Sequence, residues 1–446
     1  MFRGYGRRRM ISFRSKVLWT LLILCMYRLL CHIPLPFVSA DYMKTMVGEN
    51  GSLGLLNVLT GGGLESMSLM ALGITPYITA SIVLQLLGVV FPRLADLQKE
   101  GSTGRKKMEQ VTIAVAAGLA LFQSVFMMIG YGRQGLLSSL TWYTVLIPSV
   151  LMTLGVFLIS FAGQFITEHL FGNGISLILL TGILASYFRD AQALGSVLTA
   201  NKNLSLAVLS CVGMLLAVVL LFVFTIWLNS CEKKITVIYS GKMQMHAGYR
   251  PQNVIPLKLI AGSVVPIIFA STIITIPALI QSFTGTDVKW LWIFNSSHWF
   301  SLSEPWASMG VVLYCLMIVG FSYYYNTLNL NERQIADTLK RQGGTISGIR
   351  PGKPTEEYLR RQMRYLTLLG SLGLCVIALV PMILTAVLGI SNLSFFGTSI
   401  IITVSVIAET KKSFQAERTA SPYVKNTMFL GQQSASSFLR RKGVKS

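Results

Sequence analysis

The residue types that usually perform chemistry are few and scattered in this chain of 446 residues. Its histidines stand alone, near the ends of apolar segments or between them, at His32, His169, His246 and His298. Its cysteines have neither metal-binding nor disulfide spacing, and we expect them to pack as small hydrophobic side chains: Cys25, Cys31, Cys211, Cys231, Cys315 and Cys375. The segment 101–107 lacks the spacing of a phosphate-binding loop. These patterns argue against an enzyme and predict no metal and no cofactor.

The stretch from Asn57 to Leu87 has a different pattern, that of a path through a membrane. An amphiphilic half-segment broken by Gly61, Gly62 and Gly63 runs without a proper loop into a full apolar segment, which carries Pro76 near its start. In lipid, irregular backbone survives only where it lines a cavity or is buried in protein, because every N–H and C=O needs an internal partner. We therefore expect this stretch to build a passage and not only an anchor.

The composition places the chain among integral membrane proteins. It is 52% hydrophobic and 12% charged, with a mean hydropathy of +0.60. Because a spanning helix needs about 20 mainly apolar residues, the sequence predicts an all-α fold with ten transmembrane helices. They lie near residues 17–33, 71–91, 110–130, 143–163, 174–190, 205–228, 256–281, 307–328, 365–388 and 394–410.

The net charge of +21 follows this predicted topology and does not indicate a nucleic-acid partner. With the N-terminus inside, the cytosolic segments hold 32 of the 38 Lys and Arg residues. The outside loops hold five of them, and Arg28 lies within the first span. This asymmetry is the positive-inside rule, and it predicts that both termini are cytosolic.

The ten spans divide evenly, as in transport folds that pair two inverted halves around a central pathway. We expect a first half of residues 1–195 with five spans and a second half of residues 196–412 with five, followed by a basic cytosolic tail, 413–446. The halves share no visible sequence similarity, so the division rests on topology. Two long basic cytosolic loops, 229–256 and 329–364, predict a docking surface for a cytosolic partner.

A secondary transporter of a small solute would share such a layout, and it is the main alternative. Ion-coupled transport needs ionisable residues in the membrane interior. Apart from Arg28, the predicted spans are nearly free of Asp, Glu, Lys and His. The sequence therefore favours a passive passage over ion-coupled transport.

Five separated motifs make the chain similar to the SecY family of bacterial protein-translocation channels. The first combines the stretch 57–87 with residues 91–96 and 99–107, and the others are Ile166-Thr167-Glu168 with 172–176, Pro256-Leu257-Lys258 with 265–271, Gly348–Leu359, and Gly397-Thr398-Ser399. They occur in the family order. The resemblance implies an hourglass channel that passes unfolded secretory polypeptides across the cytoplasmic membrane.

The resemblance also implies what closes the channel. A ring of apolar side chains would seal its waist by dewetting: Ile74, Ile78, Ile175, Leu179, Ile268 and Ile402. Without the motifs, each of these would be assigned to lipid contact or to the core. A short plug of about residues 55–67, with Asn57, Gly61, Gly62, Gly63 and Glu65, would cover the ring from outside. Its glycines suit a segment that weak contacts hold and that can move, and we expect Glu65 to be solvated.

A lateral gate would open between the second and third spans on one side and the seventh and eighth on the other, towards membrane lipid. Gln85, Ser271 and Thr272 are polar residues deep in these spans. They could form hydrogen bonds across the seam, but bonding of the hydroxyl groups to carbonyls of their own helix is an equal alternative.

On the cytosolic face the match implies that Arg350 contacts a motor or a ribosome, with Lys233 and Lys234 as secondary contacts. The implied partners are SecE-like and SecG-like subunits, and a SecA-type ATPase or a ribosome, whose RNA would be the only nucleic acid contacted. Lys at positions 233 and 234, Gln164, and the N-terminal segment 1–14 depart from the family pattern. These departures leave open whether the chain is a housekeeping channel or an accessory paralogue.

Overall fold

The computed structural model describes residues 13–49, 51–91, 94, 97, 101–137, 139–170, 172–200, 204–239, 253–260, 265–284, 289–294, 299, 305–329, 332–388 and 399–415. Parts of the features discussed above lie outside these residues. They are the first residues of the N-terminal segment, most of 92–100, His246 and His298, Gly397-Thr398, and the tail beyond residue 415. The side chain of Cys211 also lies outside the description.

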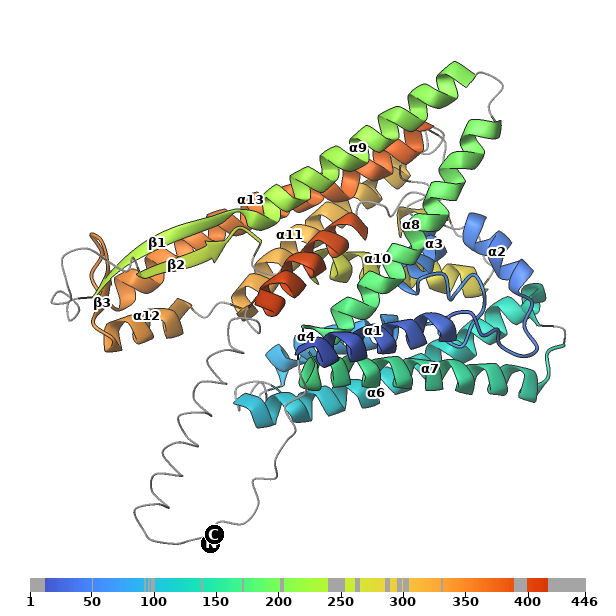
Figure 1. The fold of residues 1–446 in the computed structure, drawn as a ribbon, viewed down its shortest axis with the longest axis horizontal. Coiled ribbons are helices and arrows are strands. Elements are labelled where there is room, and N and C mark those ends of the chain that lie inside the picture. Colours follow the sequence, from blue (N-terminus) through green and yellow to red (C-terminus); the bar gives the residue numbers. More distant parts are fainter. Residues whose placement is uncertain are drawn as a thin grey trace, which may run out of the picture.

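The described residues of the first half form seven helices and a short π-helical turn. They are α1 (Phe13–Leu30), α2 (Ala40–Glu49), α3 (Gly51–Leu59), α4 (Thr75–Val90), α6 (Gly101–Tyr131), η1 (Gly132–Leu136), α7 (Trp142–His169) and α8 (Gly174–Ala200). The long apolar helices follow the predicted spans, because a run of apolar residues in lipid must satisfy its own backbone groups. Helices α6 and α7 pack along one another, and α1 lies against α7 and α8 (Figure 1).

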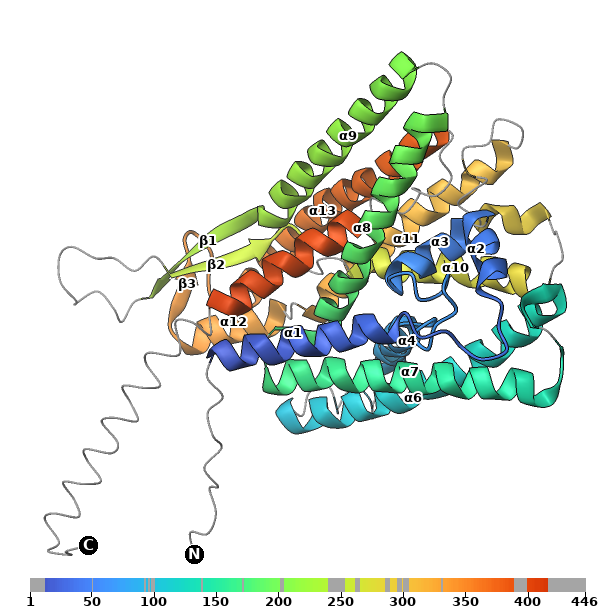
Figure 2. The same cartoon turned by 45° about the vertical axis from the view of Figure 1, so that its right-hand side comes forward.

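The second half contains α9 (Leu204–Ser230), α10 (Val265–Thr284), the 3₁₀ turns η3 (Lys289–Phe294) and η5 (Pro305–Ser308), α11 (Met309–Asn329), α12 (Glu332–Arg341) and α13 (Lys353–Leu388). Residues 399–415 are also helical. Helix α11 packs against both α10 and α13, and α9 runs along α13 (Figures 1 and 2). Each of the ten predicted spans thus overlaps a helix. Among the described residues, four helical segments are each long and apolar enough to cross a membrane. Four further apolar helices are shorter.

The start of the seventh predicted span is wrong. Residues 256–258 belong to a strand, and helix α10 begins only at Val265. The strand pairs with an earlier segment of the chain, with Leu257 opposite Lys233 and Ile255 opposite Ile235. This pairing gives the apolar residues before the helix a buried face that a hydropathy pattern does not reveal.

A small sheet is the second departure from the all-α expectation. Strands β1 (Glu232–Tyr239), β2 (Asn253–Lys258) and β3 (Gly344–Ile346) form an antiparallel sheet in the order β2-β1-β3. In β1, Ile235 and Val237 are buried while their neighbours are exposed, the alternation of a half-buried strand. The sheet joins the two long loops that the sequence predicts to be cytosolic, because β1 comes from the first and β3 from the second.

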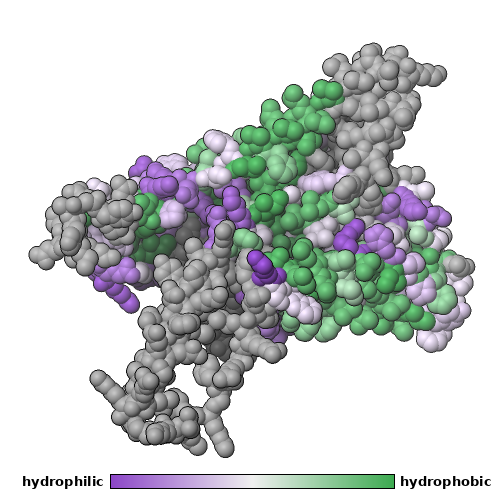
Figure 3. All heavy atoms as spheres, in the orientation of Figure 1, coloured by the Kyte–Doolittle hydropathy of each residue, from purple (hydrophilic) through white to green (hydrophobic). Residues whose placement is uncertain are grey.

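Hydrophobic and hydrophilic side chains separate along the molecule. In the view of Figure 3, hydrophobic side chains cover the middle, and hydrophilic ones gather over the sheet at one end and at the opposite end. Large apolar residues on α6, α9 and α11 are exposed, for example Leu121, Leu220 and Leu316. A belt of this kind flanked by polar ends is what a bilayer requires of a spanning protein.

One large hydrophobic core lies where the two halves meet. It draws buried side chains from α1, α4, α8, α10, α11, α13 and residues 399–415. Cys31 and Cys375 are buried within it, as expected for cysteines that pack as hydrophobic residues. A second core lies under α2, the segment after α3, and the end of α6.

Candidate functional site

The six residues expected to form the ring lie in the large core. Ile74, Leu179 and Ile402 are buried there, and Ile78, Ile175 and Ile268 are partly buried and pack against the same core. They come from the N-terminal end of α4, from α8, from α10 and from the helix at residues 399–415. Four helices that are distant in sequence therefore contribute all six apolar side chains to one large core.

Local structure fixes the start of two of these helices. Helix α4 begins directly after Ile74 with Pro76 in its first turn, where a missing backbone N–H costs nothing. Helix α8 begins at Gly174, where an added Cβ would lie 2.1 Å from the carbonyl oxygen of Gly163 on α7. Only glycine allows this close approach of α7 and α8, which places Ile175 against the core.

The predicted plug comprises the end of α3 and the turns that follow it. The N–H of Gly62 donates to the carbonyl of Asn57 over 2.8 Å, and that of Gly61 to Val58 over 3.1 Å. Gly61 has a φ of +67°. This is a Schellman motif, which ends a helix with glycine in the left-handed conformation. The glycines therefore end α3 as the sequence predicts.

Two hydrogen bonds connect Asn57, near the end of α3, with Glu65, after the glycine turn. The side-chain amide of Asn57 donates to Oε2 of Glu65 over 3.2 Å, and its Oδ1 accepts the backbone N–H of Glu65 over 3.1 Å. Asn57 is buried and Glu65 is half-buried. The expectation of a solvated Glu65 therefore holds only in part, because its carboxylate also accepts a hydrogen bond from a buried amide.

The segment is also more firmly packed than weak contacts would allow. Leu59, Leu64 and Met67 are each at most 5% exposed. Polar groups of α1 reach its backbone as well, since the Tyr27 hydroxyl donates to the carbonyl of Thr60 over 3.2 Å. Its capacity to move must therefore depend on breaking identifiable contacts.

The polar residues predicted for the gate bond within their own helices. The hydroxyls of Ser271 and Thr272 donate to the carbonyl of Ile268, and the amide of Gln85 donates to the hydroxyl of Ser81. The alternative of bonding within the helix thus holds for both hydroxyl groups. Between α4 and α11 it is Tyr324 that forms a hydrogen bond, to the backbone carbonyl of Gln85 over 3.1 Å.

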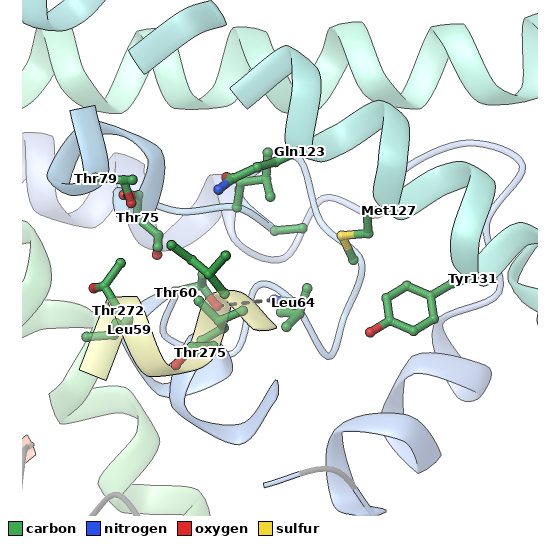
Figure 4. A pocket seen from close by; sticks show the side chains of 14 residues that line it. Leu59, Thr60, Leu64, Thr75, Thr79, Gln123, Met127, Tyr131, Thr272 and Thr275 are labelled. Carbon is green, nitrogen blue, oxygen red and sulfur yellow. Dashed lines mark hydrogen bonds between the residues drawn. The ribbon is translucent and has the colours of Figure 1, made fainter. Parts of the chain in front are cut away.

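A cavity of about 80 Å³ lies where the seam meets the plug segment (Figure 4). Its wall combines α4, α6 and α10 with the end of α3 and the turns that follow it, and its polar or polarisable side chains include Thr60, Thr75, Thr79, Gln123, Met127, Thr272 and Thr275. The Oγ1 of Thr75 is buried and has no hydrogen-bond partner in the structure. The cavity shows that the two sides of the seam are not fully packed against each other.

The residues predicted for docking gather around the sheet and are exposed. Arg350 lies in the turn before α13, and its carbonyl accepts the hydroxyl of Thr355 over 2.9 Å. Lys233 donates to the side chain of Gln362 on α13 over 2.6 Å, and Lys234 pairs with Glu232 at 3.9 Å. Both predicted loops therefore contribute to one basic surface.

The helix at residues 399–415 reaches the base of this sheet. Partial burial, together with the nearby ammonium group of Lys412, lowers the pKa of Lys258 below its ordinary value. The end of this helix thus places a second positive charge, that of Lys412, beside Lys258 at the end of β2.

Two residues with prominent roles in this geometry escaped the sequence reasoning. Tyr324 sits in a run of three tyrosines, which signals an aromatic belt more readily than a contact across a seam. Arg28 stood out only as the exception in the apolar spans, and the structure places its guanidinium on the carbonyl of Gly61 in the plug segment.

Comparison with known proteins places this geometry in context. The sequence model of the SecY family matches residues 68–411. The chain is 33% identical over 416 residues to the protein translocase subunit SecY of Staphylococcus epidermidis, covering 92% of this chain and 95% of the relative. It is 32% identical to that of Staphylococcus aureus over the same coverage.

Solved structures share the fold. A structure described as a protein conducting channel superposes with a TM-score of 0.66 at 17% identity, covering 94% of this chain and 95% of the other. Sec61 in a canine ribosome–channel complex gives a TM-score of 0.64 at 16% identity, with the same coverage. The match of the family over most of the sequence and the shared fold lead to one conclusion: the chain belongs to the SecY family.

Proposed function

We propose that the protein is the central subunit of a protein-conducting channel in the cytoplasmic membrane. It passes unfolded secretory polypeptides across the membrane and releases signal or transmembrane segments sideways into lipid. The observation that supports the proposal is that six apolar side chains from four separate helices belong to one core, which also includes Leu59 at the end of the predicted plug helix. Such a ring excludes water and ions when empty and fits loosely around a passing chain.

The lateral exit is assigned to the seam between α4 and α6 on one side and α10 and α11 on the other. The cavity beside Thr75 and the single described bond between α4 and α11, from Tyr324, support this assignment. A seam with few polar bonds and incomplete packing separates at a low cost. In this account ten helices cross the membrane as two inverted halves, with both termini in the cytosol.

The driving force comes from a partner, because the proposed role of this chain is a passage and not a catalyst. The basic surface around Arg350 and the sheet is assigned to a cytosolic motor of the SecA type or to a ribosome. A solved structure of Sec61 in a ribosome–channel complex, which shares this fold, supports a ribosome as a partner. Small SecE-like and SecG-like membrane subunits complete the proposed assembly.

Reconstitution tests the proposal directly. The full chain is purified with the small subunits that accompany it, incorporated into liposomes and supplied with a SecA-type ATPase, ATP and a radiolabelled precursor protein. We expect the precursor to become protected from added protease only when the chain and ATP are both present. Absence of protection with an ATPase that drives a known SecY channel in parallel would contradict the proposal.

A further inference from the structure

Arg28 is a charged residue in an apolar helix, and its partner is a backbone carbonyl. Its Nη1 donates to the carbonyl oxygen of Gly61 over 2.9 Å. None of the ion pairs between described residues involves Arg28. A charged side chain inside a membrane protein is costly and is retained where it has a specific partner. The carbonyl of Gly61 is that partner in this structure.

The position of this carbonyl explains why it attracts a cation. Gly61 follows the C-terminus of α3, where the last carbonyls have no partner inside the helix and carry the negative end of the helix dipole. The Schellman turn satisfies the carbonyls of Asn57 and Val58. The carbonyl of Gly61 lies beyond that turn, and the guanidinium satisfies it instead.

The backbone leaves room for the guanidinium only because residue 61 is glycine. An added Cβ would lie 2.6 Å from Nη1 of Arg28 and 2.7 Å from the Cα of Gly182 on α8. The positive φ of Gly61 also disfavours any other residue. Arg28, Gly61 and Gly182 therefore fit together as a unit that joins α1, the plug segment and α8.

Neighbouring side chains hold the same end of α3. The hydroxyl of Tyr27 and the thiol of Cys31 both point to the carbonyl of Thr60, at 3.2 and 3.9 Å. From the other side, the hydroxyl of Ser186 on α8 reaches the carbonyl of Val58 at 3.5 Å. Among these donors the guanidinium is the only one that carries a charge, and hydrogen bonds from charged groups are the stronger ones.

We propose that Arg28 is a latch that holds the plug segment in its closed position and so sets the threshold for opening. The proposal rests on the proposed channel function. To leave the ring, the segment must break the bond between Arg28 and Gly61 and expose the guanidinium to another acceptor. Arg28 is thereby a positioning residue that determines which signal sequences open the channel.

A crosslink between Cys31 and a cysteine at position 60 reports the closed position. In full-length protein whose other cysteines are replaced by alanine, Thr60→Cys places a second thiol beside Cys31, and a short thiol-specific crosslinker joins them. We expect Arg28→Met to raise the ratio of open to closed segment about tenfold, as expected for the loss of a bond from a charged donor, and the rate of crosslinking to fall as the closed population falls. Arg28→Lys keeps the charge but not the planar fork, so we expect an intermediate rate. Arg133→Met, at an exposed arginine in η1, is the matched control and should leave the rate unchanged.

Ion conductance of the same variants in planar bilayers provides the second readout. Arg28→Met should raise the resting conductance. It removes a charge from an apolar helix and so should not hinder insertion. Gly61→Ala should raise the conductance further, because its Cβ would also meet the Cα of Gly182 and its φ is positive.

The results distinguish a failure of the latch proposal from a failure of the proposed channel function. A wild-type crosslinking rate and conductance in both variants would overturn the latch. If the wild-type chain protects no precursor in liposomes, the proposed channel function fails instead, while the crosslinking rate still shows whether Arg28 holds residues 55–67.

Discussion

The hydroxyl of Tyr324 on α11 donates a hydrogen bond to the backbone carbonyl of Gln85 on α4, over 3.1 Å. This bond joins the two sides of the proposed lateral gate. The hydroxyl groups of Ser271 and Thr272 donate to the carbonyl of Ile268 within α10 and not across the seam. Tyr324 therefore contributes to the strength of the proposed closed gate.

Tyr324→Phe removes this hydrogen bond and keeps the aromatic side chain. A neutral hydrogen bond contributes about 0.5–1.5 kcal/mol, so the gate should open about two- to tenfold more readily. Export of a reporter protein with a defective signal sequence measures this change, and it should rise. Tyr323→Phe is the matched control, because the hydroxyl of Tyr323 bonds to Arg364 on α13 instead. Equal export in the two variants would remove the role of Tyr324.

The ring is tested by making it polar. Ile78→Asn combined with Ile268→Asn places two amides in the constriction, and a polar constriction no longer excludes water. Resting ion conductance in planar bilayers should increase severalfold. Ile147→Asn, at a position on α7 that is 40% exposed, should leave conductance unchanged. Unaltered conductance in the double variant would assign these residues to ordinary packing.

Substitutions of Asn57 and Glu65 should destabilise the turn after α3 to different degrees. Asn57→Ala leaves the N–H and carboxylate of Glu65 without their partner, a loss of about 1–3 kcal/mol. Asn57→Asp sets two carboxylates side by side and should destabilise the turn more at neutral pH than at acidic pH. Glu65→Gln keeps an acceptor for the Asn57 amide and should resemble the wild type. Hydrogen exchange of residues 60–66 measures these differences, and equal exchange in all variants would contradict the role of the pair.

Arg350→Glu reverses a charge on the proposed docking surface. Removal of an arginine that anchors an interface typically costs about 2 kcal/mol or more, so binding of the ATPase should weaken about thirtyfold or more. Lys233→Glu should have a smaller effect, because that ammonium group is already bonded to Gln362. Lys44→Glu on α2, an exposed residue paired with Asp41, is the control on the proposed outer face. If the affinity for the ATPase is unchanged in Arg350→Glu, the motor does not dock on the surface around Arg350.

The helices could be predicted because a spanning segment is recognised from its own apolar residues. The break at Gly61 was visible for the same reason, since glycine acts on the local backbone. Motif similarity, and not periodicity, singled out Ile74 and Ile402 among many apolar residues, and the structure brings them into one core.

Contacts between distant segments could not be predicted in this way. Strand β1 pairs Val237 with Ile346, and no local pattern specifies a partner so far along the chain. Whether a hydroxyl such as that of Thr272 bonds to its own helix depends on its rotamer. The partner of Arg28 is a backbone carbonyl, which every residue possesses and which the sequence therefore cannot single out.

Crosslinking of a polypeptide in transit tests the central claim most directly. A photoreactive amino acid replaces Ile268 of the ring in one variant and Leu316, which is 66% exposed on α11, in another. Both variants are reconstituted with a precursor that a folded C-terminal domain arrests during transport. The account predicts an ATP-dependent crosslink to the arrested chain from position 268 and none from position 316. Absence of the crosslink from position 268, with the precursor partly protected from protease, would contradict the assignment of the pore.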